Sequence, residues 1–271
     1  MRAITDFILQ DYEQERIIDQ PGSPCRPSPG AVSTLIGQLR TLLLPGFFGT
    51  DVGCGDRQSY LSKVVAELYW QLESLVAPLL PESKGICREF LRQIPSIRTA
   101  MQEDLQAFLA GDPAAAGPEE ILVCYPGFYA IMVQRLAHVL YGLQVPLLPR
   151  MMTELAHSHT GIDIHPGAVL GKAFFIDHGT GVVIGQTTCI GDGVKIYQGV
   201  TLGAISTRGG QFLKNKKRHP TIEDAVTVYA GASILGGDTV IGRGAVIGAN
   251  AFVTASVEPG AVVIGCRTDP G

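Results

Sequence analysis

The sequence predicts an α+β protein in which an N-terminal α-helical domain precedes a parallel β-helix of hexapeptide repeats. Three observations support this fold class. An aliphatic residue returns every six residues in the C-terminal part, glycine often follows it, and the earlier part shows helical spacing of apolar residues. A sustained period of six fits neither the 3.6-residue period of an amphipathic helix nor the period of two of a half-buried strand. It is typical of a solenoid in which each hexad supplies one short strand and one corner.

The repeat begins at Ile164 and continues in two runs of hexads. The aliphatic residues at the first place of each hexad are Ile164, Leu170, Ile176, Ile184, Ile190, Ile196, Leu202, Ile222, Val228, Ile234, Ile241, Ile247 and Val253. Because three hexads complete one triangular coil, successive coils would stack by parallel strand pairing, with these side chains inside. The count is interrupted by a two-residue slip after Ile176 and by a loop at residues 203–221. Repeats are usually interrupted at functional positions, so the slip and the loop are candidate sites for chemistry.

The segment before the repeat predicts a helical domain. Apolar residues recur at helical spacing, with prolines at the joins, in residues 60–80, 86–91, 97–109, 128–141 and 151–157. Residues 1–20 also look helical, whereas residues 21–30 are rich in proline and predict a linker. We therefore expect a helical and proline-rich N-terminal extension at 1–58, a helical domain at 59–160 and a β-helix domain at 161–271. Such a helical domain usually serves oligomerisation or caps the first coil.

Composition argues against several classes of protein. The chain has 271 residues, a formal net charge of −4 and 17% charged residues, which argues against a general nucleic-acid-binding protein. Its six cysteines form no CxxC pair, which is typical of neither a zinc knuckle nor a disulfide scaffold and fits the reducing cytoplasm. The N-terminus has no basic-then-apolar signal pattern, and no apolar run approaches the ~18 residues of a membrane span. We expect a soluble cytoplasmic protein.

Asp163 and His178 are the candidate catalytic residues. Asp163 stands just before the first hexad position, and His178 follows Ile176 at the slip. In a coil of about eighteen residues the two would lie near one edge on neighbouring rungs. A carboxylate that holds one imidazole nitrogen leaves the other nitrogen free as a general base, which turns a hydroxyl into a nucleophile. Alternatively, both are corner residues bonded to the backbone.

Three other residues could bind a substrate. Asp112 could cap a helix or turn, or could reach a substrate amine. Arg218 offers a planar fork for a small carboxylate and His219 a second donor, although both could belong to a hydrated basic loop. Counting faces places their loop on a different edge from His178. The loop and His178 could therefore share a ligand only across a subunit boundary, such as that of a trimer.

Several segments closely resemble the serine O-acetyltransferase family. They are Asp163-Ile164-His165-Pro166, Asp177-His178-Gly179-Thr180-Gly181-Val182-Val183-Ile184-Gly185, Arg218-His219-Pro220-Thr221-Ile222, Asp112-Pro113-Ala114, Pro126-Gly127-Phe128-Tyr129-Ala130 and Arg135-Leu136-Ala137-His138. The likeness covers roughly residues 105–265. It implies a left-handed β-helix, because known hexapeptide prisms coil against the right-handed rule for parallel crossovers.

The resemblance also implies an activity and site roles. The family transfers acetyl from acetyl-CoA to the hydroxyl of L-serine, giving O-acetylserine and CoA in the first step of cysteine biosynthesis. By resemblance, His178 would be the general base and Asp163 would orient it. The residues that would hold the amino acid's ammonium and carboxylate are Asp112, Asp177, Arg218 and His219. Acetyl-CoA would lie against Gly203 and Ala204, whose backbone would face the oxyanion, and along the prism beside Ala230 and Ala249. The resemblance implies a homotrimer or a dimer of trimers, and we expect no metal.

The chain departs from the family's pattern in two places. The family's C-terminal tail docks into a sulfhydrylase partner, whereas this sequence stops at Asp269-Pro270-Gly271, so we expect no stable complex by that route. The loop at residues 203–221 is also longer than in the best-known members, which leaves its contacts open.

Three rival functions remain. An acyltransferase for homoserine, a substituted serine or a sugar would use the same imidazole chemistry. A zinc hydro-lyase would need closely paired histidines, which the repeat lacks. A structural prism would not need both Asp163 and His178.

Overall fold

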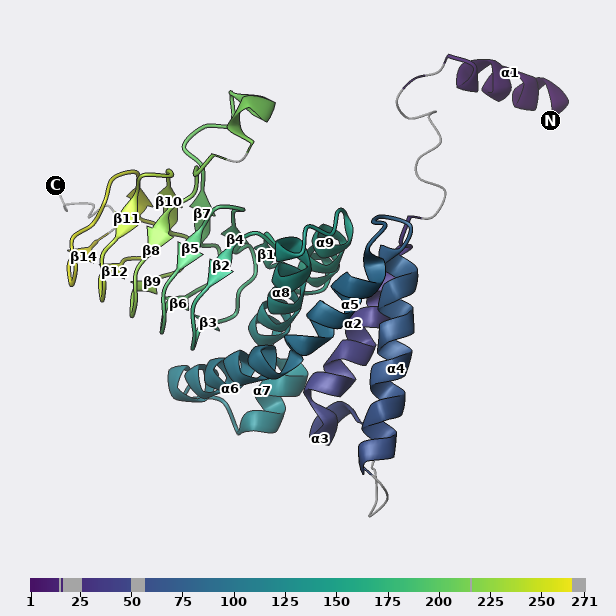
Figure 1. Cartoon of the computed structure of the whole chain (residues 1–271). Coiled ribbons are helices and arrows are strands. Elements are labelled where there is room, and N and C mark those ends of the chain that lie inside the picture. Colours follow the sequence, from purple (N-terminus) through teal and green to yellow (C-terminus); the bar gives the residue numbers. More distant parts are fainter. Residues whose placement is uncertain (15, 17–25, 50–56, 215, 265–271) are drawn as a thin grey trace.

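The computed structural model describes residues 1–14, 16, 26–49, 57–214 and 216–264. Helices come first and strands follow (Figure 1). The helices are α1 (Arg2–Tyr12), α2 (Pro29–Leu43), α3 (Pro45–Phe48), α4 (Arg57–Val76), α5 (Ser83–Arg92), α6 (Ile94–Gly111), α7 (Pro118–Cys124), α8 (Pro126–Gly142) and α9 (Leu148–Thr160). Residues 21–25 of the expected linker at 21–30 and the C-terminal residues 269–271 lie outside the described residues. No described helix has the length and apolar character that a membrane span requires.

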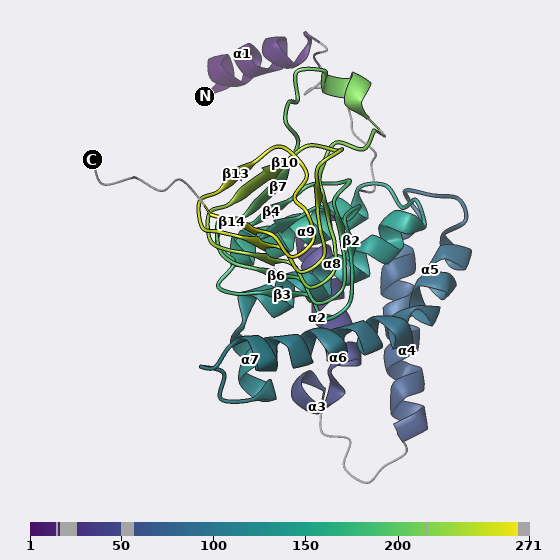
Figure 2. The same cartoon turned by 90° about the vertical axis from the view of Figure 1, so that its left-hand side faces the viewer.

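The strands are short and wind into a triangular prism (Figure 2). They are β1 (Asp163–Ile164), β2 (Val169–Leu170), β3 (Phe175–Ile176), β4 (Val183–Ile184), β5 (Cys189–Ile190), β6 (Lys195–Ile196), β7 (Thr201–Gly203), β8 (Thr221–Ile222), β9 (Thr227–Val228), β10 (Ser233–Leu235), β11 (Val240–Ile241), β12 (Val246–Ile247), β13 (Phe252–Val253) and β14 (Val262–Val263). We call the three parallel sheets A (β1-β4-β7-β10-β13), B (β2-β5-β8-β11) and C (β3-β6-β9-β12-β14).

The hexad residues fill the prism as the sequence predicts. In sheet A, Ile164 pairs in register with Ile184 and Ile184 with Leu202. All three are at most 2% exposed, so the aliphatic side chains stack one coil above another inside. The neighbouring strand positions point outward because successive side chains alternate across a strand. This alternation leaves the faces and edges of the prism for ligands or partners.

Two edges of the prism matter for the site. At the edge we call the histidine edge, residues 177–182 carry the chain from sheet C to sheet A. At the edge we call the loop edge, residues 185–188 and the long loop after β7 carry it from sheet A to sheet B. The loop contains a short 3-10 helix, η2 (Gly210–Leu213), and projects from the prism in Figure 1. The two edges flank the same face, sheet A.

The helical domain begins earlier in the chain than the sequence suggests. Helix α2 lies within the expected extension at 1–58, yet it packs against α4 and α9. Its buried residues belong to the main apolar core and are Val32, Leu35, Ile36, Leu39 and Leu43. The division expected at residue 58 therefore cuts through a packed unit. The proline-rich stretch before α2 concealed it, because proline at the first turn starts a helix as readily as it ends one.

A buried ion pair joins the helical domain to the first coil. Arg135 on α8 donates two hydrogen bonds to Asp104 on α6, at 2.7 and 2.8 Å, and Asp104 also accepts from the Phe174 backbone N–H at 3.0 Å. Arg135 donates further to the carbonyl of Gly171 at 2.8 Å. The Asp104 side chain is fully buried. These contacts fix the C-terminal end of α6 beside β3, which places Asp112 near the histidine edge.

Candidate active site

His178 occupies a strained corner of the histidine edge. Its φ is +55°, in the left-handed region where non-glycine residues are uncommon, and Gly179 and Gly181 follow with φ of +86° and +80°. A Cβ at Gly179 would lie 2.4 Å from the side chain of Ile162, so the turn requires glycine there. The imidazole is 70% exposed. A histidine held in such a conformation with its ring open to solvent is a candidate for chemistry.

Two carboxylates lie close to this imidazole. Asp177 Oδ2 is 3.7 Å from His178 Nε2. Asp112, the C-cap of α6, interacts electrostatically with His178 and accepts a hydrogen bond from the Tyr125 hydroxyl at 2.5 Å. That hydrogen bond is the main cause that lowers the pKa of Asp112. Asp112, Asp177 and His178 therefore form one half-site, which presents two negative charges beside a base.

The residues expected along acetyl-CoA extend this half-site down the prism. Strand pairing places Ile176, Ile196, Val228 and Ile247 on one ladder. Past the strands, backbone hydrogen bonds from Gly199 to Thr180, from Gly231 to Gln198 and from Asn250 to Ala230 continue the ladder, and His178 stands in the two-residue slip just before Thr180. The structure thus brings His178, Ala230 and Ala249 onto one edge, with small side chains below the base. Gly203 and Ala204 lie instead at the end of β7, on the loop edge.

Arg218 and His219 form a second half-site on the loop edge. Arg218 donates a hydrogen bond to Gln186 Oε1 at 2.5 Å, and Gln186 donates to the Tyr141 hydroxyl at 2.7 Å. The Lys217 ammonium fastens the end of the loop through the carbonyls of Thr187, His219 and Pro220. Arg218 has further N–H donors for an incoming carboxylate. The C-terminal end of the loop is therefore held against the prism, whereas most of the other described loop residues are exposed.

His219 is held as a neutral hydrogen-bond donor. Its Nδ1 accepts from the Thr187 backbone N–H at 3.1 Å and lies 2.8 Å from the Thr187 hydroxyl. Burial lowers its pKa to about 4, helped by the charges of Arg218 and Lys217. With Nδ1 accepting, the ring proton sits on Nε2. A Cβ at Gly185 would lie 2.2 Å from that nitrogen, so glycine at this position makes room for the ring.

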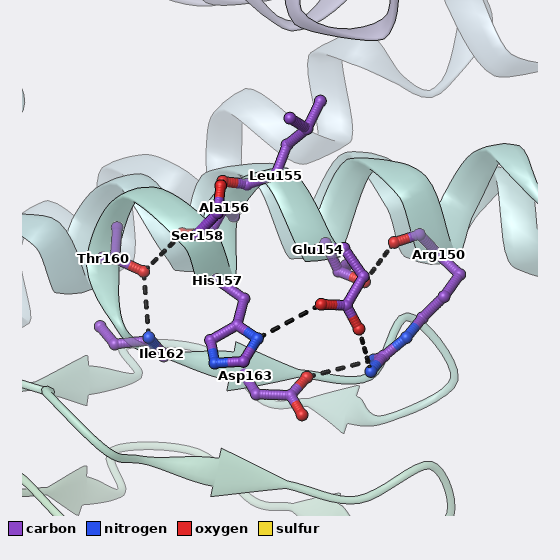
Figure 3. Close-up of polar contacts among 10 residues, drawn as sticks. Arg150, Glu154, Leu155, Ala156, His157, Ser158, Thr160, Ile162 and Asp163 are labelled. Atoms are coloured by element: carbon purple, nitrogen blue, oxygen red, sulfur yellow. Dashed lines mark hydrogen bonds and ion pairs between the residues drawn. The ribbon is translucent and has the colours of Figure 1, made fainter. Parts of the chain in front are cut away.

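Asp163 does not contact His178 within one chain. Its carboxylate accepts a hydrogen bond from Arg150 of α9 at 3.1 Å (Figure 3). No hydrogen bond or ion pair among the described residues joins it to His178, although the sequence suggests that pairing. The reason is the corner between them, since Asp163 pairs in register with Val183, beyond the histidine edge. Asp163 lies on sheet A, where its backbone N–H donates to the Val182 carbonyl at 2.9 Å.

A cluster around Asp163 has side chains that could bind a metal ion, but it also contains the cationic side chain of Arg150. Single ligand atoms of Glu154, His157 and Asp163 lie within 4.8 Å of one another. Figure 3 shows the Arg150 guanidinium between the two carboxylates, and Arg150 forms ion pairs with both. A fixed guanidinium repels a divalent cation at that point. The cluster is therefore better explained as an ion-pair network that anchors α9 on sheet A.

The candidate site residues thus fall into two half-sites on different edges. A face about five to six residues wide separates the edges by roughly 15–20 Å, at ~3.3 Å per residue. A single small substrate cannot span that distance within one chain. Sequence reasoning missed Tyr125, Gln186 and Thr187, which orient Asp112, Arg218 and His219. Only their place next to predicted site residues in the fold reveals them.

Comparison with known proteins identifies the family. No protein-family profile matches the chain. A curated serine acetyltransferase of Synechococcus elongatus is 43% identical over 231 residues, which is 77% of this chain and 72% of that protein. The chain belongs to the serine acetyltransferase family. A serine acetyltransferase of Mycobacterium tuberculosis is 50% identical over 167 residues, which is 62% of this chain and 70% of that protein. The predicted enzyme class, an acyltransferase, is confirmed.

Solved serine acetyltransferase structures share the whole architecture. The native serine acetyltransferase 1 of Entamoeba histolytica has a TM-score of 0.79 at 36% identity and covers 96% of this chain and 97% of its own. The same protein in complex with L-cysteine has a TM-score of 0.77 at 39% identity, over 85% of this chain and 86% of its own. A Neisseria gonorrhoeae serine acetyltransferase in complex with serine has a TM-score of 0.61 at 28% identity, over 87% of this chain and 97% of its own. The predicted fold, a helical domain followed by a left-handed parallel β-helix, is confirmed.

Proposed function

We propose that the chain transfers the acetyl group of acetyl-CoA to the hydroxyl of L-serine at a site shared by two protomers. Family membership supports the reaction, and the division of the site residues between two edges supports the shared site. O-acetylserine then carries a leaving group that a thiol-forming step can displace, which fits the first step of cysteine biosynthesis. The free thiols of Cys87, Cys124 and Cys189 fit a reducing compartment such as the cytoplasm.

A trimer joins the two half-sites. If three prisms turn sheet A toward a three-fold axis, the histidine edge of one protomer meets the loop edge of the next. The outward residues of sheet A below the first coil are uncharged, as an interface core requires. They are Val183, Thr201, Ser233 and Phe252. Val183 is 39% and Phe252 is 72% exposed in the single chain, so association would bury apolar surface.

His178 is the general base of this mechanism. Its imidazole takes the proton of the serine hydroxyl as the hydroxyl oxygen attacks the thioester carbonyl carbon. A new C–O bond forms, the carbonyl oxygen becomes an oxyanion, and the backbone at Gly203 and Ala204 of the neighbouring edge supplies donors to it. When the C–S bond breaks, the imidazolium returns its proton to the leaving thiolate. Asp163 is proposed to orient the imidazole, as the family resemblance implies.

The charges of the two half-sites select an amino acid. Asp112 and Asp177 attract an ammonium, whereas Arg218 and the neutral His219 donate hydrogen bonds to a carboxylate. A sugar offers neither charge and would leave these buried or half-buried groups unpaired. Homoserine and substituted serines keep both charges, so the length of the acceptor is the remaining alternative within this proposal.

An acceptor screen tests the proposed function. Release of CoA thiol should be far faster with L-serine than with galactosides or chloramphenicol, with L-homoserine measured alongside. The variant His178→Ala should lower turnover by about 10²-fold or more while the circular dichroism spectrum stays the same. A galactoside preferred over serine would overturn the substrate assignment. Full activity of the variant would remove His178 as the base.

A further inference from the structure

The hydroxyl of Tyr125 belongs to the histidine half-site, yet no step of the proposed mechanism uses it. It donates a hydrogen bond to Asp112 Oδ2 at 2.5 Å. The other oxygen of the same carboxylate, Oδ1, accepts from the Ala114 backbone N–H at 2.8 Å. Because both oxygens are held, the Asp112 carboxylate is fixed in one orientation before any substrate arrives.

The position of Tyr125 is set by packing and not by a ligand. Tyr125 is the N-cap residue of α8, and its ring meets Phe108 edge to face, with ring centroids 6.1 Å apart. Phe108 is fully buried and also packs edge to face on Phe128 and Phe175. This aromatic cluster lies where α6 and α8 meet β3. The ring is therefore held rigidly, and its hydroxyl is presented to Asp112 as a fixed donor.

The Tyr125 hydroxyl offsets the repulsion between the carboxylates of Asp112 and Asp177. Asp112 and Asp177 both lie near His178, and two carboxylates in one site repel each other until a cation binds. The Tyr125 hydrogen bond lowers the pKa of Asp112, which keeps that carboxylate charged in the empty site. The same bond raises the pKa of Tyr125 to about 12, so the phenol stays protonated and can go on donating.

We infer that Tyr125 is a positioning residue for the amino-acid substrate, holding Asp112 in the orientation that receives the substrate ammonium. The inference rests on the proposed function, because serine supplies that ammonium. Loss of the hydroxyl should weaken the binding of serine and leave the chemical step and the binding of acetyl-CoA unchanged.

Steady-state kinetics of Tyr125→Phe test the inference, since this variant keeps the ring and its packing on Phe108. We expect KM for serine to rise about tenfold, the scale of a lost hydrogen bond to a charged group. The kcat and the KM for acetyl-CoA should stay within about twofold, and the melting temperature should be unchanged. Tyr69→Phe, which removes a hydroxyl from α4 in the helical domain, is the matched control and should change none of these values.

A double-mutant cycle shows whether Tyr125 acts through Asp112. In an Asp112→Asn background, adding Tyr125→Phe should raise KM for serine by less than about twofold, because the charged partner has already gone. Additive effects, an unchanged KM for serine in the single variant, or a parallel fall of kcat and melting temperature would each overturn the inference. Lack of serine turnover in the unmodified enzyme would instead refute the proposed function itself.

Discussion

A site shared by two protomers predicts that two impaired variants restore each other's activity when they are mixed. His178→Ala removes the base from the histidine edge, and Arg218→Ala removes the carboxylate donor from the loop edge. Each homotrimer then has three damaged sites. In a mixed trimer, a protomer that keeps His178 can stand beside one that keeps Arg218. That boundary carries an undamaged site.

The expected recovery follows from counting. When the two variants are present in equal amounts and assemble at random, each site has a one-half chance of an intact His178 and a one-half chance of an intact Arg218. About one quarter of the sites should therefore be fully active over all trimers, and about one third in the trimers that contain both variants. Co-expression with two different affinity tags, followed by tandem purification, isolates the mixed trimers, and native mass spectrometry confirms their composition. The assay is kcat/KM for L-serine, because Arg218 acts on serine binding.

The control is a mixture of two variants whose substitutions both lie on the histidine edge. Asp112 and His178 lie in the same half-site, so in a mixture of Asp112→Asn with His178→Ala every protomer has a damaged histidine edge. No undamaged site can form in that mixture, although every loop edge is intact. Both mixtures therefore contain undamaged loop edges, but only the first can combine them with an undamaged histidine edge. If the first mixture stays at the mean of its two parents, the site does not lie between protomers.

Two further predictions concern stability. Asp104→Asn should lower the free energy of unfolding by about 3–5 kcal/mol, because the Arg135 guanidinium is left buried without its partner. Arg243→Ala, at an exposed ion pair, should cost less than about 1 kcal/mol, and equal losses in urea denaturation would contradict the burial argument. Burial lowers the pKa of both His165 and His219 to about 4, so between pH 6.5 and 4 the unfolded chain binds protons that the folded chain does not. Stability should therefore fall as the pH drops through this window, and His165→Gln should flatten the slope in thermal melts; an unchanged slope would count against this cause.

The prism could be predicted from the sequence because its geometry is local. A period of six places each aliphatic residue at the same point of every face, and Ile164, Ile184 and Leu202 are buried in register as expected. The helical domain was less accessible. Helix α7 has only seven residues and follows a glycine, so it shows too few turns to establish a helical period. Helix α2 was hidden by the prolines before it.

The candidate site could be predicted only as a set of residues and not as an arrangement. The hexad count placed His178 and the Arg218 loop on different edges, and the structure agrees. The same count could not say on which side of a corner a side chain projects, so it paired Asp163 with His178 within one chain. The role of Tyr125 depends on the end of α6 meeting the start of α8. No spacing in the sequence carries that information.

The location of Asp163 leads to a last prediction about its partner. In one chain its carboxylate pairs with Arg150 and has no described hydrogen bond or ion pair with His178. If it orients an imidazole, that imidazole is His178 of the neighbouring protomer. A mixture of Asp163→Ala with His178→Ala should then recover about one quarter of the sites, as for Arg218. A mixture of Asp163→Ala with Arg218→Ala should recover none, because under this pairing both residues of each site come from the same protomer. Recovery in the second mixture and none in the first would place Asp163 and His178 in one chain and refute the cross-protomer pairing.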